Sequence, residues 1–208
     1  MSTTSVAPAS AWRLLGLLGQ SVWYDNVARP ALRSGLLERL VREDHVTGGT
    51  SNPSIIARAV DSSDVYDADI RSASPTASDA AVAERLVVAD IRDACDLLQQ
   101  VWERTAGQDG YISLEEEARL AFDVDGSVRR GHELRGLVDR PNLMIKVPGT
   151  DAGIAAFRRL TRDGVSVNVT LLFSRTRYRE VVEAYLTGLE ERLADGEAVD
   201  AIASVASF

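Results

Sequence analysis

The sequence LMIKVP at residues 143–148 restricts the fold of this chain more than any other stretch. Five of its six residues are apolar, which is typical of a strand that is buried on both faces of a sheet. The exception, Lys146, is the only lysine among 23 basic residues, and the other 22 are arginine. A lysine amine in an apolar pocket is the usual nucleophile of imine-forming enzymes. The alternative is a strand-end lysine that only extends to water.

Short runs rich in β-branched residues alternate with helical patterns along the whole chain, which is typical of a parallel sheet with crossover helices. The predicted strands cover residues 21–25, 46–50, 111–115, 143–147, 165–172 and 201–207. A doubly wound nucleotide-binding sheet would carry a glycine-rich loop after its first strand, and residues 22–26 offer none. We therefore predict an α/β fold of the (β/α)8 TIM-barrel type.

Polar residues stand near the ends of these strands, where a barrel gathers groups from different strands into one mouth. They are Asp25, Asn52, Glu115, Lys146, Asn168, Thr170 and Ser207. Asn168 and Thr170 share one face of their strand because side chains alternate along it, so a ligand on that face would explain both. Asp25 and Asn52 are equally well placed to cap a helix. Glu116 and Glu117 follow Glu115, and the pattern alone does not identify the glutamate that matters.

Three helices have clear sequence patterns. Residues 87–102 carry one apolar face and are stopped by Gly107, and residues 154–160 follow Asp151 as a predicted N-cap. A third helix starts at Ser174, with Phe173 and Tyr178 placed for a hydrophobic staple. Its predicted apolar face consists of Tyr178, Val181, Val182, Tyr185, Leu186 and Leu189.

The composition is that of an ordinary globular protein, with 45% hydrophobic and 26% charged residues over 208 positions. We expect a single domain over residues 11–208 after a disordered N-terminus at residues 1–10. A net charge of −8 with scattered arginines argues against nucleic-acid binding. We see no signal peptide and no membrane span. The lone Cys95 favours the reducing cytoplasm, and His45 and His132 have no metal-ligand spacing, so we expect neither a metal nor a cofactor.

Several motifs together resemble the transaldolase family. They are GQSVWYDN at residues 19–26, TSNP at 50–53, IKVP at 145–148 and NVTLLFS at 168–174. The segment DIRDACD at residues 90–96 is most similar to the longer, actinobacterial-type branch of that family. The order and spacing of these motifs are far more specific than any one of them.

The resemblance implies an enzyme of the non-oxidative pentose phosphate pathway that acts on small sugar phosphates. It would move a dihydroxyacetone unit from a ketose phosphate, such as sedoheptulose 7-phosphate, to glyceraldehyde 3-phosphate through a Schiff base on a lysine. By motif, Lys146 is that lysine, Asp25 is the base for C–C cleavage, and Glu115 with Thr170 manages proton transfers through a water. Asn52, Asn168 and Ser207 are implied to hold the substrate hydroxyls.

The sequence departs from the family pattern in three places, one of which is Gly149, where the family usually has alanine before threonine. The family has a small apolar residue after Glu115, whereas Glu116 and Glu117 follow here; strand alternation sends Glu116 to the opposite face. The chain also stops at Phe208, although a barrel takes about 250 residues. We therefore expect a C-terminally incomplete barrel, with about six of eight β/α units, that is poorly stable and weakly active.

Two other functions remain open at this level. One is an aldolase of the same superfamily that cleaves fructose 6-phosphate without an acceptor sugar. The other is a truncated, non-catalytic remnant that binds a sugar phosphate.

Overall fold

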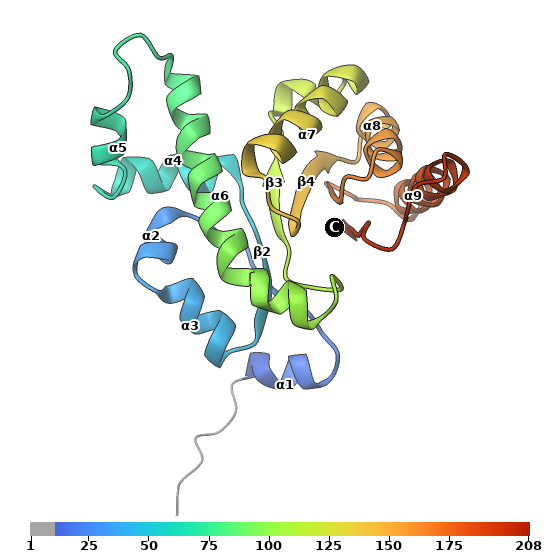
Figure 1. Ribbon diagram of the computed structural model, residues 1–208, viewed down its shortest axis with the longest axis horizontal. Coiled ribbons are helices and arrows are strands. Elements are labelled where there is room, and N and C mark those ends of the chain that lie inside the picture. The colour runs from blue at the N-terminus through green and yellow to red at the C-terminus, as the bar shows by residue number, and fades with distance from the viewer. Residues whose placement is uncertain (1–10) are drawn as a thin grey trace, which may run out of the picture.

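The computed structural model describes residues 11–208, so the predicted disorder of residues 1–10 lies outside it (Figure 1). Its strands form one parallel sheet in which every strand pairs with the next one in the chain. The strands are β1 (Val22–Tyr24), β2 (Val46–Thr50), β3 (Ile112–Glu115), β4 (Leu143–Pro148), β5 (Val167–Thr170) and β6 (Ser204–Ala206). All six predicted strands are confirmed. The sheet curls as an incomplete (β/α)8 barrel, with β1 and β6 at the edges of the described part.

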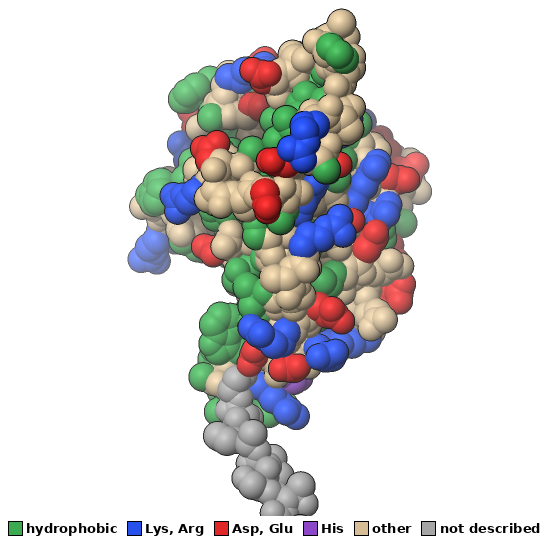
Figure 2. Space-filling view, turned by 90° about the vertical axis from the view of Figure 1, so that its left-hand side faces the viewer, with side chains coloured by type: hydrophobic (Ala, Val, Ile, Leu, Met, Phe, Trp, Pro, Cys, Tyr) green, Lys and Arg blue, Asp and Glu red, His purple; other side chains and the backbone are tan. Residues whose placement is uncertain are grey.

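Helices connect the strands and pack on the outer face of the curled sheet (Figure 1). The main α-helices are α1 (Ala11–Leu17), α2 (Arg29–Arg33), α3 (Leu36–Glu43), α4 (Pro53–Ser62), α5 (Asp67–Arg71), α6 (Asp79–Arg104), α7 (Val124–Val138), α8 (Asp151–Arg162) and α9 (Arg175–Ala194). A short 3-10 helix, η1 (Ala118–Leu120), follows β3. On the face drawn in Figure 2, arginine and acidic side chains are interspersed rather than grouped by sign.

The core lies between the sheet and the helices because alternate strand residues point outward. Ile112, Leu114, Ile145, Val147, Val167 and Val169 belong to this buried cluster, together with side chains from α6, α7 and α8. The residues between them along the strands point to the inside of the curl, and many of these are polar. Because side chains alternate between the two faces of each strand, the sheet has an apolar outer face and a polar inner face.

The helix predictions are partly corrected. Ser174 is confirmed as the N-cap of α9, since its hydroxyl accepts a hydrogen bond from the Arg177 N–H. Thr150, not Asp151, caps α8: its hydroxyl accepts from the Gly153 N–H, and the carboxylate of Asp151 pairs with Arg177 instead. A Thr-Asp pair offers two cap candidates, and local geometry selects the first.

The predicted apolar face of α9 is wrong in part. Val181 is buried, but Tyr178, Val182 and Leu186 stay exposed, and so does Phe173 of the predicted staple. Instead, Ala184 and Gly188 face the core, where a Cβ on Gly188 would lie 2.7 Å from the Arg158 carbonyl oxygen. Small residues let α9 approach α8 closely, and the apolar residues beside them are left outside.

A buried ion pair joins the segments that follow β1 and β2 to α6. The Arg29 guanidinium donates to the Asp90 carboxylate at 2.7 Å, and Asp90 is 1% exposed. The Tyr66 hydroxyl donates to the other Asp90 oxygen at 2.7 Å, and the Arg29 guanidinium lies 4.5 Å from the centre of the Tyr66 ring. Both oxygens of this buried carboxylate are therefore satisfied.

Removing Asp90 should strongly destabilise the fold, because the buried Tyr66 hydroxyl would lose its acceptor and the buried Arg29 would keep only the half-exposed Asp69 as a partner. We expect Asp90→Ala to lower the free energy of unfolding by about 3 kcal/mol or more, measured by urea denaturation. The control is Asp67→Ala, which breaks an exposed i,i+4 pair with Arg71 and should cost less than about 0.5 kcal/mol. Equal effects of the two substitutions would contradict this role of Asp90.

Candidate active site

Lys146 and Glu115 form an ion pair inside the curl of the sheet. They are register partners on β4 and β3, and the distance between Lys146 Nζ and Glu115 Oε2 is 2.9 Å. Lys146 is 9% exposed, so its amine reaches the interior of the sheet and not bulk solvent. The carboxylate can accept a proton from this amine directly, which an amine needs before it can attack a carbonyl carbon.

A chain of hydrogen bonds fixes the Asn168 amide beside this pair. Asn168 is the register partner of Lys146 on β5. Its Nδ2 donates to Ser113 Oγ at 3.0 Å, and its Oδ1 accepts from Ser207 Oγ at 2.9 Å. Sequence reasoning missed Ser113, although it precedes Glu115 by two residues and therefore shares its inward face.

A cavity of about 470 Å³ lies on the inner side of the sheet. Asp25, Asn168 and Ser207 all line it, and so does Met144, which shares the inward face of β4 with Lys146. Asp25 follows the end of β1 and is exposed at this cavity. The structure thus brings Asp25 to the same cavity as the groups next to Lys146.

The two remaining predicted site residues lie at strand ends close by. Thr170 is buried at the end of β5, two residues beyond Asn168 on the same face. Asn52 follows β2, and its Oδ1 accepts from the Ser54 N–H at 3.0 Å and from the Ser54 hydroxyl at 2.7 Å. Asn52 therefore caps α4, and it is not among the residues that line the cavity.

Glu116 lies on the opposite face of the strand end from Glu115, as alternation predicts. It is 3% exposed, and its Oε1 lies 2.9 Å from the Ser127 hydroxyl of α7. Burial raises the pKa of Glu116 to about 7, against a smaller lowering by the hydrogen bond from Ser127. The neighbouring Glu117 and Glu115 carboxylates also raise it.

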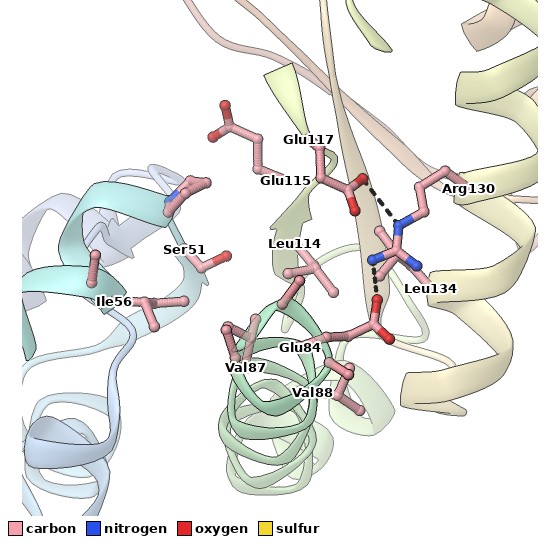
Figure 3. Close-up of a pocket in the computed structure, with 15 residues that line it drawn as sticks. Ser51, Ile56, Glu84, Val87, Val88, Leu114, Glu115, Glu117, Arg130 and Leu134 are labelled. Atoms are coloured by element: carbon pink, nitrogen blue, oxygen red, sulfur yellow. Dashed lines mark hydrogen bonds and ion pairs between the residues drawn. The ribbon is translucent and has the colours of Figure 1, made fainter. Parts of the chain in front are cut away.

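A second cavity, of about 510 Å³, opens between α4, α6 and α7 (Figure 3). Its walls are mostly apolar, with Ile56, Val87, Leu114 and Leu134 among them. Arg130 pairs there with Glu117 and Glu84, while the Glu115 side chain points away from Arg130 (Figure 3). Arg130 is therefore shared between two carboxylates at this cavity, and Glu115, which also lines it, pairs with Lys146 instead.

Among residues 11–208, no group of three or more His, Cys, Asp or Glu side chains is arranged to hold a metal ion. No helix in the same range is both long and apolar enough to cross a membrane.

Comparison with known proteins gives consistent results. The family described as "Transaldolase/Fructose-6-phosphate aldolase" matches residues 22–208. A transaldolase of Thiobacillus denitrificans is 49% identical over 192 residues, which are 92% of this chain and 54% of that protein. A transaldolase of Mycobacterium tuberculosis is 44% identical over 195 residues, covering 93% of this chain and 52% of its own. "Transaldolase 2" of Nostoc sp. is 43% identical over 194 residues, which are 91% of this chain and 50% of that protein. The chain spans about half the length of the curated relatives it matches.

The buried Glu116 carboxyl should make stability depend on pH. Its pKa is about 7 in the folded chain and near 4.5 when unfolded, so between these values the folded state keeps a proton that the unfolded state loses. Stability should therefore fall as pH rises through this window, by about 3 kcal/mol. Glu116→Gln cannot ionise and should remove most of this fall in urea unfolding measured from about pH 4 to about pH 8. An unchanged pH dependence in this variant would exclude Glu116 as its source.

Proposed function

Because this chain belongs to the transaldolase/fructose-6-phosphate aldolase family, we propose that it carries the imine-forming centre of a transaldolase. The donor is a ketose phosphate such as sedoheptulose 7-phosphate, and the acceptor is glyceraldehyde 3-phosphate. The reaction belongs to the non-oxidative pentose phosphate pathway in the cytoplasm. The observation that carries the proposal is the Lys146–Glu115 pair, a single lysine held 2.9 Å from a carboxylate inside a parallel sheet.

Lys146 is the nucleophile. Glu115 takes a proton from the Lys146 ammonium, and the free amine attacks the ketone carbon of the donor. Loss of water, with Thr170 holding that water, leaves an iminium between Lys146 and the sugar. A proton supplied by Glu115 makes the departing oxygen a better leaving group.

Asp25 is the base for carbon–carbon cleavage. It accepts the proton of the C4 hydroxyl, and the electrons of the C3–C4 bond pass to the iminium nitrogen. An aldose phosphate leaves, and a three-carbon enamine stays on Lys146. The enamine carbon then attacks the carbonyl of the acceptor, Asp25 returns its proton to the new hydroxyl, and hydrolysis of the iminium frees Lys146.

Asn168 and Ser207 hold the hydroxyl groups of the three-carbon unit. The support is the hydrogen-bond chain Ser207–Asn168–Ser113, which orients the Asn168 amide next to Lys146 before a substrate arrives. We also propose that Asn52 contributes to this subsite, although its Oδ1 accepts from Ser54 in this structure.

Borohydride trapping tests the role of Lys146. With fructose 6-phosphate as donor, intact-mass and peptide analysis should find one reduced three-carbon unit on Lys146. Lys146→Arg keeps the positive charge for Glu115 but cannot form an imine, so it should give no adduct on this peptide. The absence of an adduct in the unsubstituted chain would favour a non-catalytic sugar-phosphate-binding remnant.

Asp25 should be needed for cleavage but not for imine formation. In Asp25→Asn the trapped species should change from the three-carbon unit to the complete phosphorylated ketose. The rate of cleavage should fall by about 10²-fold to 10⁴-fold, which is the usual contribution of a positioned general base. A three-carbon adduct formed at the unsubstituted rate would remove Asp25 from this role.

The acceptor distinguishes transfer from simple cleavage. A transaldolase should consume fructose 6-phosphate at an appreciable rate only when erythrose 4-phosphate or another aldose phosphate is present. An aldolase should release dihydroxyacetone without an acceptor. Measuring both products with and without the acceptor decides between the two activities of the family.

A further inference from the structure

The end of β3 carries three consecutive glutamates, and each one has a different partner. Glu115 pairs with Lys146 of β4, Glu116 contacts Ser127 of α7, and Glu117 pairs with Arg130 of α7. The backbone N–H of Glu116 also donates to the Lys146 carbonyl oxygen at 3.2 Å. Residue 116 thus ties the strand of the lysine to the first turns of α7.

The hydrogen bonds around Ser127 would be satisfied better by a protonated Glu116. The Ser127 hydroxyl lies 2.9 Å from Glu116 Oε1 and 3.2 Å from the Leu120 carbonyl oxygen, but it has only one hydrogen to donate. A protonated Glu116 solves this, because it donates to Ser127 Oγ while Ser127 donates to Leu120. Within residues 11–208 the buried Oε2 of Glu116 has no hydrogen-bond partner, which an ionised carboxylate would tolerate poorly.

We propose that Glu116 is a positioning residue which, while protonated, holds the Glu115 carboxylate against Lys146. The proposal deepens the proposed function and rests on it for the identity of the reaction. Glu116 touches neither the lysine amine nor the cavity on the inner face. It acts through the backbone, because fixing residue 116 to both β4 and α7 leaves the adjacent Glu115 little freedom to move.

Ionisation of Glu116 should weaken this arrangement in two ways. The single Ser127 hydrogen could then serve only one of its two acceptors. The new charge would also lie beside the Glu115 and Glu117 carboxylates. Two cations face this region, and both already have partners. Arg130 is paired with Glu84, Glu117 and Glu133, and Lys146 is paired with Glu115. Asp123, which caps α7, adds a further negative charge on the same helix. Arg130 favours the ionised form and lowers the pKa of Glu116, but by less than burial and the two neighbouring carboxylates raise it.

The consequence is a pH response of imine formation. Since burial raises the pKa of Glu116 to about 7, the positioned state is lost as pH rises through neutrality. We expect the rate of the borohydride-trapped adduct on Lys146 to fall about tenfold between about pH 6 and about pH 8, less than the full contribution of a positioned acid or base.

Two substitutions of Glu116 distinguish a positioning role in the reaction from a purely structural role. Glu116→Gln stays neutral and can still donate to Ser127, so it should keep the acidic-side rate and lose the fall above pH 7. Glu116→Leu also cannot ionise but cannot donate, so its rate should be low and independent of pH. The control Glu133→Gln removes an exposed carboxylate from the same Arg130 cluster and should keep the fall. A fall that persists unchanged in Glu116→Gln would overturn the proposal.

A readout without substrate distinguishes failure of this proposal from failure of the proposed function. Because Lys146 is the only lysine, protein labelled with ¹³C at the lysine ε-carbon gives one side-chain resonance. The ¹³C chemical shift of this resonance, followed against pH, should show a step near pH 7. The step should disappear in Glu116→Gln and stay in Glu133→Gln. If no adduct forms at any pH but this step behaves as expected, the proposed reaction is contradicted and the proposed role of Glu116 is supported. A resonance without a step in the unsubstituted chain would overturn the positioning.

Discussion

A lysine placed inside a sheet must find a negative partner, and this requirement organises the interior of the fold. Removing an ammonium from water costs several kcal/mol unless a carboxylate compensates it. β3 supplies that carboxylate at the register position next to Lys146, where adjacent strands bring side chains closest. The parallel register of β3 and β4 is therefore tied to the chemistry of the site, since a shift by one residue would pair Lys146 with an apolar side chain or with Glu116.

The same register extends the polar layer to β5. Asn168 stands beside Lys146 and receives its orientation from hydroxyl groups on β3 and on the segment after β6. Ser113 and Asn168 are buried, and without partners each would carry a desolvation cost. Linked as donor and acceptor they satisfy one another, so the interior stays ordered without a ligand. The dry layer of valine and isoleucine on the other face of the same strands supplies the stability that this polar layer lacks.

The sequence predicts the strands and their inward residues well, because a period of two is a local property. Asn168 and Thr170 can be assigned to one face of β5 in this way. The pattern alone does not show whether Glu115 or Glu116 pairs with Lys146, because that depends on which face of β3 is turned toward the lysine on β4. The exposed side of α9 and the contribution of Ser113, in contrast, depend on distances between elements. Those distances are set by packing, as at Gly188 against α8, and no local pattern contains them.

The three glutamates after β3 show how environment alone gives one residue type three different behaviours. Glu115 faces a lysine and serves as a counter-ion, whereas Glu117 shares an arginine with Glu84 at a partly exposed position. Glu116 faces α7, where among the described residues its carboxyl group hydrogen-bonds to Ser127, and Arg130 lowers its pKa by less than burial raises it. If Glu116 were ionised, it would add a second negative charge close to Glu115, and Lys146 is already paired with Glu115. Keeping this acid neutral preserves a one-to-one match between Lys146 and Glu115, and a one-to-one match lets a proton pass between two defined atoms.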